Sequence, residues 1–145
     1  MPPKHAIDQL VKEFFALFTT LEGTRLNLDK IHDLCLPEAI IIKNVDGQRE
    51  INNLAQFIQP REKLLNSGAL TDFSEQETWE QTSIFGHIAQ RFCIYEKSGK
   101  QNGEPFHGRG MKTFQFILTD GGWKISSLAW DDESESQKIE PSQWS

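Results

Sequence analysis

The spacing of apolar residues in this chain changes near residue 70, from a helical period to a strand period. Before that point, a single stripe at helical spacing predicts an amphipathic helix over residues 6–20, made of Ile7, Leu10, Val11, Phe14, Phe15 and Phe18. From Thr71 onward, apolar residues recur at every second position, which is typical of β-strands. Helices grouped before a run of strands indicate an α+β fold, with the helices on one face of the sheet.

Shorter signals complete the first half of the chain. We expect a short helix, two strands joined by a tight turn, and a third helix, over residues 28–34, 38–43, 49–51 and 53–68. Asn52 or Asn53 begins this third helix, and Gln56 stands three residues after Asn53, which is the spacing of a capping box.

The second half is expected to be a meander of long antiparallel strands over residues 71–85, 88–97, 109–119 and 123–130. Gly86-His87 has the length and composition of a two-residue turn between the first two of these strands. The polar segment 98–108 predicts a loop, and Asp120-Gly121-Gly122 predicts the last hairpin turn.

Length and charge limit the domain organisation and the classes of partner. A chain of 145 residues fits one domain, expected over residues 5–133 and followed by an acidic, disordered tail over 134–145. The net charge is −6 and the basic residues are not clustered, so nucleic acid and anionic membranes are excluded as expected partners. With no secretory segment or membrane-length apolar run, Cys35 and Cys93 are expected to be reduced, buried thiols of a cytoplasmic protein.

The last two strands carry apolar residues on both faces. Phe114 and Phe116 share one parity, whereas Met111 and Ile117 share the other. Since the helices cover only one face, the outer face is expected to be covered by a second copy in an isologous homodimer.

Two stretches carry a resemblance to a known family: "FGHIAQRFCIYEKSG" (85–99) and "GRGMKTFQFILTDGGWKISSLAWDDE" (108–133). They resemble the nuclear transport factor 2-like superfamily, and in particular its small bacterial SnoaL-like and ketosteroid-isomerase-like members of uncharacterised function. The resemblance implies a cone-like, curved antiparallel sheet of about six strands, wrapped around a long N-terminal helix with two further helices. It also implies a pocket in the open end of the cone, and homodimers.

The family includes enzymes, so we compared its catalytic patterns with this chain. Trp130 and Asp132 match the Trp-x-Asp of the limonene epoxide hydrolase branch, but the Arg-x-Asp of the preceding strand is missing from "MKTFQFIL". The only tyrosine, Tyr95, lies on a strand, whereas the ketosteroid isomerases place their donor tyrosine on the first helix. The alternative to a catalytic role for Asp131 and Asp132 is that both acids are exposed to solvent, as acids at the end of a strand usually are.

A group around Arg91 is the candidate ligand site. Arg91 and Tyr95 share a face of an otherwise apolar strand, and a buried arginine requires a partner. A Gly86-His87 turn places Arg91 opposite Thr82 and diagonal to Glu80, whereas a bulge brings Glu77 to its face. The residues expected to line the cone and hold a polar or carboxylated small molecule are Glu77, Trp79, Arg91, Tyr95, Gln115 and Trp130. The alternative is a structural salt bridge.

The sequence therefore favours a small-molecule-binding domain without an identified reaction. Two alternatives remain: an isomerase, dehydratase or hydrolase that uses a pocket acid such as Asp132, and a dimeric protein-interaction module. No cofactor is expected, and the four histidines lack the pairwise spacing of a metal site.

Overall fold

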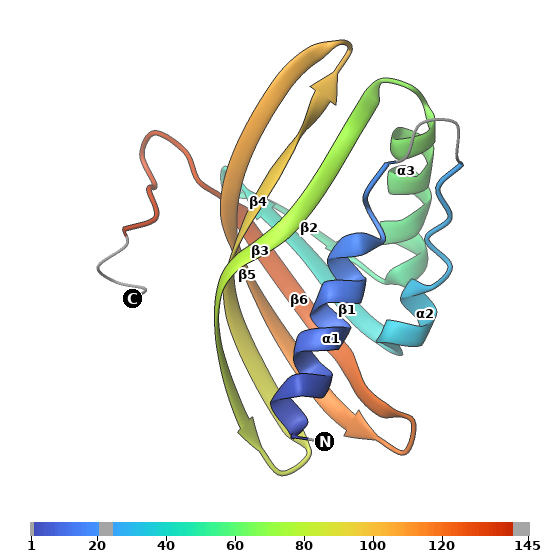
Figure 1. The fold of residues 1–145 in the computed structure, drawn as a ribbon, viewed down its shortest axis with the longest axis vertical. Helices are drawn as coiled ribbons and strands as arrows, with labels where there is room; N and C mark the ends of the chain where they lie inside the picture. The colour runs from blue at the N-terminus through green and yellow to red at the C-terminus, as the bar shows by residue number, and fades with distance from the viewer. Residues whose placement is uncertain (1, 21–24, 141–145) are drawn as a thin grey trace.

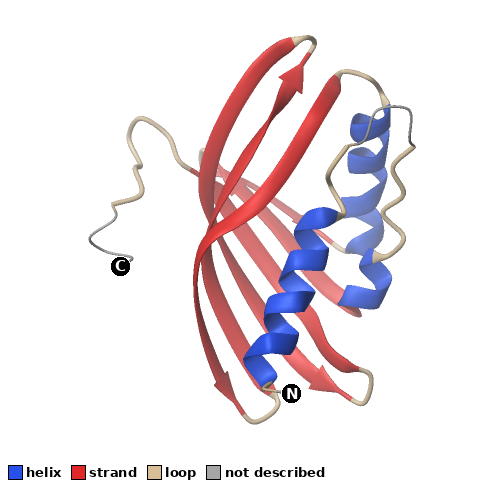
Figure 2. Cartoon of the chain, viewed as in Figure 1, coloured by secondary structure: helices blue, strands red, loops and turns tan. Residues whose placement is uncertain are grey.

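The computed structural model describes residues 2–20 and 25–140, and in this part of the chain three helices lie on one face of a curved, six-stranded sheet (Figures 1 and 2). The elements are α1 (Pro3–Ala16), α2 (Ile31–Leu34), β1 (Cys35–Val45), β2 (Gln48–Asn52), α3 (Leu54–Asn66), β3 (Leu70–Phe85), β4 (Ile88–Gln101), β5 (Glu104–Thr119) and β6 (Gly122–Asp132). The sheet order is β2-β1-β6-β5-β4-β3, which leaves β2 and β3 as open edges. The expected α+β fold with about six strands is confirmed.

The sheet is mixed, whereas the resemblance implied an antiparallel one. Strand β1 runs parallel to β6, with Ile41 opposite Leu128, and all other neighbouring strands are antiparallel. The first strand of the helical half is thus inserted beside the last strand of the meander. Parallel neighbours need a long crossover, and here residues 46–121, about half of the chain, form it.

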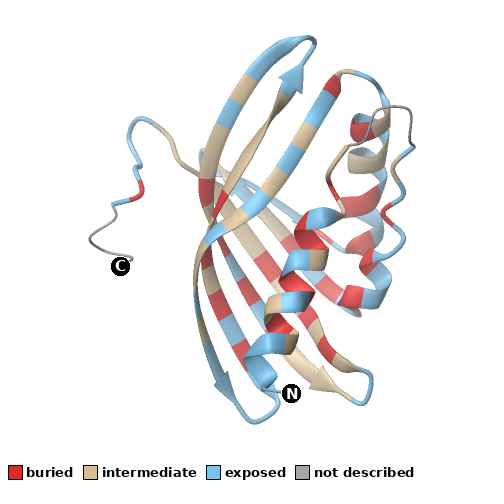
Figure 3. Ribbon diagram, viewed as in Figure 1, coloured by how far each residue is buried: buried red, intermediate tan, exposed pale blue. Residues whose placement is uncertain are grey.

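Helix α1 lies along the concave face of the sheet (Figure 1). It has 14 residues, so the long N-terminal helix that the resemblance implied is wrong; the helix is short, and it begins and ends earlier than the expected 6–20. The early start is explained by Pro3, because a proline in the first turn fixes a helical φ and its missing N–H would have no partner there. The predicted stripe is confirmed as core: all six of its residues are buried, and Figure 3 shows that buried positions concentrate between the helices and the sheet.

Helix α3 begins as predicted. The Asn53 side chain accepts a hydrogen bond from the Gln56 backbone, and the Gln56 side chain accepts one from the Asn53 backbone, at 2.8 and 2.9 Å. This capping box fixes the start of α3, which lies at the right of Figure 1 and packs its apolar side on the sheet.

The Gly86-His87 turn is confirmed, because Phe85 pairs with Ile88 across it. The predicted loop at 98–108 is wrong: β4 and β5 continue through it and meet at a two-residue turn formed by Asn102-Gly103. These two residues have φ of 52° and 84°, the left-handed values that such a turn needs and that Asn-Gly readily adopts. The longer hairpin extends the cone beyond Tyr95.

None of the helices in the described ranges is long and apolar enough to cross a membrane. After β6, Ser134 and Gln137 form an isolated bridge, and the Ile139 backbone donates to Glu133 at 2.8 Å. Residues 141–145, the end of the expected tail, lie outside the described residues.

Candidate functional site

A cavity of about 500 Å³ opens between the concave face of the sheet, α1 and α3. Aromatic side chains from all three contribute to its wall, among them Phe14, Phe18, Phe57, Tyr95, Phe106 and Trp130. Charged side chains also enter it, from β1 to β6 and from α3: Lys43, Glu50, Arg61, Glu75, Lys97, Lys112 and Asp132. The cavity therefore combines an apolar wall with a few convergent polar groups, which is the usual make-up of a small-molecule site.

Tyr95, Lys97 and Asp132 form one polar group in the cavity. The Tyr95 hydroxyl donates to Oδ1 of Asp132, and Nζ of Lys97 lies 3.0 Å from Oδ2 of the same carboxylate. Burial of the phenol, together with its hydrogen bond to Asp132, raises the pKa of Tyr95 well above its usual value. Tyr95 is thus held as a neutral hydrogen-bond donor, and Asp132 has a phenol on one side and a lysine on the other.

A glycine makes the position of Tyr95 possible. Gly110 on β5 lies between Tyr95 and Asp132 in the register. A Cβ atom at this position would collide with the Tyr95 hydroxyl and with the carbonyl oxygen of Asp131. The missing side chain therefore lets the phenol ring lie directly on the β5 backbone.

Lys112 is a buried cation behind this group. Its side chain is 6% exposed, and Nζ lies 3.0 Å from Oε1 of Glu75 on β3. The ammonium also lies 4.4 Å from the ring centroid of Tyr95 and 4.5 Å from that of Trp130, within the range of a cation–π contact. Lys112 shares the parity of Phe114 and Phe116, so this parity was the sequence signal that could have placed it inside the cone.

Arg61 of α3 is a further cation that sequence reasoning missed. The guanidinium carbon lies 4.0 Å from the ring centroid of Phe57 and 5.5 Å from that of Trp130. The Nη1 atom of Arg61 donates to the Phe57 carbonyl at 3.3 Å, and no carboxylate of the described residues lies within ion-pair distance of the guanidinium. Burial lowers the pKa of Arg61, and the more distant Glu50 and Glu75 oppose this effect.

The structure separates the six residues predicted to line the cone. Tyr95 and Trp130 line the cavity. Gln115 does not: it is exposed on the outer face, opposite Gln90 and Ser127, because inner and outer positions alternate along β5. Trp79 lies opposite Ile94 and outside the cavity wall, after a bulge in β3.

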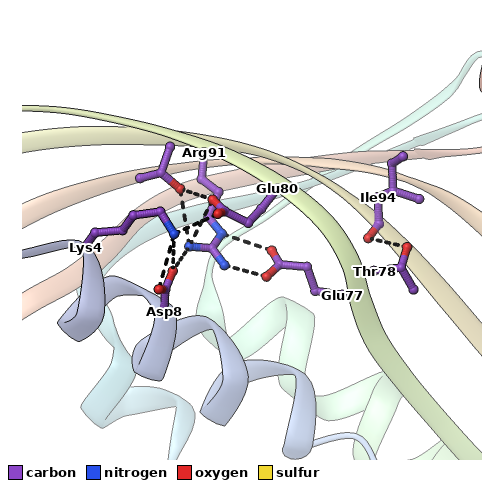
Figure 4. A network of polar contacts seen from close by, with 8 residues as sticks. Lys4, Asp8, Glu77, Thr78, Glu80, Arg91 and Ile94 are labelled. Carbon is purple, nitrogen blue, oxygen red and sulfur yellow. Dashed lines mark hydrogen bonds and ion pairs between the residues drawn. The ribbon is translucent and has the colours of Figure 1, made fainter. Parts of the chain in front are cut away.

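Arg91 and Glu77, the remaining two, belong to a separate ion-pair network at the start of α1 (Figure 4). Nε of Arg91 donates to Glu77 at 2.9 Å, and Nη1 lies 2.6 Å from Asp8 on α1 and 3.5 Å from Glu80 on β3. Lys4 adds contacts to Asp8 at 3.1 Å and to Glu80 at 2.7 Å. The network ties the helix to two strands and lines a different groove, beside α1.

Both registers considered for Arg91 turn out to hold in part. Arg91 lies opposite Thr82, as the Gly86-His87 turn requires, and a bulge between Glu77 and Trp79 returns Glu77 to the inner face.

The two acids that end β6 point to different places. Asp132 enters the cavity, whereas Oδ2 of Asp131 accepts a hydrogen bond from the Gln137 side chain at 2.9 Å. Within residues 2–20 and 25–140, no cluster of His, Cys, Asp and Glu has an arrangement that could hold a metal ion.

Solved structures share this fold at low sequence identity. An NTF2-like superfamily protein from Salmonella enterica superposes with a TM-score of 0.70 at 13% identity, covering 92% of both chains. An NTF2-like protein from Cytophaga hutchinsonii gives 0.67 at 13% identity, covering 91% of this chain and 99% of that one. A candidate ketosteroid isomerase from Shewanella frigidimarina gives 0.66 at 22% identity, covering 86% and 94%.

No protein-family model and no curated protein sequence matches the chain. The structural similarity therefore establishes the fold, which is that of the nuclear transport factor 2-like proteins. A fold of this kind carries many unrelated functions.

Proposed function

We propose that the cavity of the cone binds a small organic molecule. The observation that carries the proposal is the cavity itself: about 500 Å³ of space, with aromatic walls and polar groups that converge on it. Ligand sites usually have volumes of about 300–1,000 Å³ and this mixture of apolar walls and a few placed polar groups.

The polar groups suggest how such a ligand is oriented. The Asp132 carboxylate accepts hydrogen bonds from Tyr95 and Lys97, and these three side chains form a polar patch beside the aromatic side chains of the wall. A ligand with an apolar body and one or two polar substituents satisfies both surfaces. Burial of its apolar body contributes roughly 25 cal/mol per Å².

A thermal-shift screen against a broad panel of metabolites tests the proposal. We expect hits in the unaltered protein, and we expect Trp130→Ala to weaken them because Trp130 forms part of the wall. Gln115→Ala is the matched control, since Gln115 lies on the outer face of the sheet. A panel without hits, or hits that Gln115→Ala weakens as strongly as Trp130→Ala, would contradict the proposal.

An enzyme that uses Asp132 is the second candidate. The favouring observation is that Asp132 and Glu75 both enter the cavity, so a second carboxylate reaches the site from β3 rather than from the preceding strand. Each hit from the screen is incubated with the protein and with Asp132→Asn, and products are sought by mass spectrometry. An enzyme converts a hit and loses this conversion in the variant, whereas hits recovered unchanged would leave binding alone.

We also propose that the outer face of the sheet contacts a second copy of the chain. The helices lie on the concave face, and the β3–β4 hairpin exposes Phe85 by 83% and Ile88 by 56%. These residues border a groove of about 360 Å³ that also includes Ile84 and Ile117. Light scattering is expected to give twice 16.6 kDa, and Phe85→Glu is expected to give a monomer. A monomeric unaltered protein would overturn this proposal.

A further inference from the structure

Three of the four described cations that line the cavity come from positions next to Trp130. Trp130 on β6 lies opposite Lys43 on β1 and opposite Lys112 on β5, so the three side chains form a row across the sheet. Arg61 approaches the same ring from α3, with its guanidinium carbon 5.5 Å from the ring centroid. Arg61 and Lys112 therefore contact the Trp130 ring, and Lys43 is the neighbour of Trp130 on β1.

The carboxylates near this row do not neutralise all three cations. Glu75 is engaged by Lys112 at 3.0 Å. Glu50 lies opposite Lys43 in the β1–β2 register and accepts from the Asn52 side chain at 2.9 Å. Asp132 is engaged by Lys97 at 3.0 Å. Among the described residues, four cations and three carboxylates line the cavity, so one positive charge remains in excess there.

Arg61 is the cation whose geometry leaves room for a further partner. A guanidinium has five N–H donors, and one acceptor in the described part of the chain contacts it, the Phe57 carbonyl at 3.3 Å. The flat face is covered by the Phe57 ring at 4.0 Å, which holds the group in one plane and leaves its edge for hydrogen bonds. Because the group is half-buried and has no ion-pair partner among the described residues, an anion bound at its edge would compensate the cost of burial.

We propose that Arg61 binds the carboxylate of an aromatic monocarboxylic acid whose ring system lies against Trp130 and Phe57. The inference rests on the proposed function, that the cone cavity holds a small molecule. A single carboxylate matches both the excess of one charge and the planar fork of a guanidinium. The Phe57 and Trp130 rings meet edge to face, with centroids 6.2 Å apart, and together form an aromatic corner for the body of the ligand.

The same charges select against other anions. Glu50, Glu75 and Asp132 line the cavity as well, and a dianion such as a phosphate monoester would be repelled by them after the one excess charge is neutralised. A neutral analogue of the acid would leave the Arg61 edge without its charged partner. Affinity is therefore expected to follow the order carboxylate, then amide, then phosphate.

Isothermal titration with three matched probes tests the inference: 2-naphthoate, 2-naphthamide and 2-naphthyl phosphate. We expect the naphthoate to bind about tenfold more tightly than the amide, the ratio typical of a charge-assisted hydrogen bond. Arg61→Gln should remove this preference, with a larger loss of affinity for the naphthoate than for the amide. Arg61→Lys should keep part of it, because the charge remains and the planar fork is lost.

Lys30→Gln is the control for net charge, since Lys30 is an exposed lysine that does not line the cavity. Loss of naphthoate binding in this control equal to the loss in Arg61→Gln would overturn the inference. The inference would also be overturned by equal affinity for acid and amide, or by tighter binding of the phosphate. Hits in the metabolite screen without any naphthoate binding would overturn it as well, and all three outcomes would leave the proposed function intact. A screen without any hit contradicts the proposed function itself. If Arg61→Gln does not fold, the comparison of acid and amide in the unaltered protein decides.

Discussion

The network at the start of α1 predicts that Arg91→Met destabilises the fold strongly. The Arg91 side chain is 3% exposed and contacts Glu77, Asp8 and Glu80, and the methionine keeps most of its apolar stem. Removing one partner of a buried ion pair costs about 3–5 kcal/mol, because the remaining charges stay buried without compensation. Since the Asp8 side chain is 43% exposed and Lys4 still contacts Asp8 and Glu80, the lower end applies, about 3 kcal/mol. For a chain of this length, this corresponds to a fall in Tm of roughly 10 °C.

The pH dependence of this loss gives a second measurement of the same network. Burial tends to raise the pKa of Asp8 and of Glu80, but hydrogen bonds from Arg91 and Lys4 to Asp8, and from Lys4 and Thr82 to Glu80, outweigh it and lower both pKa values. A carboxylate with a lowered pKa in the folded state stabilises the protein at pH values above its unfolded-state pKa of about 4. This stabilisation is lost as the pH falls through the folded-state pKa. The difference in unfolding free energy between the unaltered protein and Arg91→Met should therefore narrow below about pH 4.

Urea unfolding at pH 7 and pH 3 measures both effects. Arg109→Met is the matched control, since Arg109 is 37% exposed and pairs with Glu133 at 2.9 Å near the surface. An exposed pair of this kind contributes at most about 1 kcal/mol. Equal losses in the two variants at pH 7, or a difference for Arg91→Met that stays constant down to pH 3, would refute the role assigned to the network.

Three further predictions concern other parts of the fold. Gly110→Ala should destabilise the protein by about 1–3 kcal/mol in urea unfolding and change the near-ultraviolet circular dichroism of Tyr95, because the new methyl collides with its hydroxyl; an unchanged spectrum would contradict this contact. Asn53→Ala should cost about 1 kcal/mol through loss of the capping box, and Asn53→Ser should restore most of it, in the same unfolding assay. Cys35 and Cys93 should react with Ellman's reagent only after unfolding, since burial raises the pKa of Cys35 to about 12 and that of Cys93 further; fast labelling of the native protein would refute this.

The local elements could be predicted because their causes lie within a few residues. The apolar stripe of α1, the Asn53–Gln56 capping box and the Gly86-His87 turn each depend on near neighbours, and each is present in the structure. The Asn102-Gly103 turn is also a local feature, since Asn-Gly is typical of a two-residue hairpin turn. It was not predicted because the residues around it are polar and resemble those of a loop. Tyr95 and Trp130 line the cavity, and each shares its parity with a buried neighbour on the same strand, Cys93 and Leu128.

The sequence by itself thus determined the fold class, the order of the elements and the residues of the core. Only the tertiary structure decided which charges meet. The β3 bulge returned Glu77 to the inner face, α1 brought Asp8 to Arg91 across 83 positions, and α3 placed Arg61 over Trp130. The physical reason is that periodicity and turn chemistry act over a few residues, whereas an ion pair depends on the packing of elements that are distant in the chain. One bulge is enough to exchange the two faces of a strand.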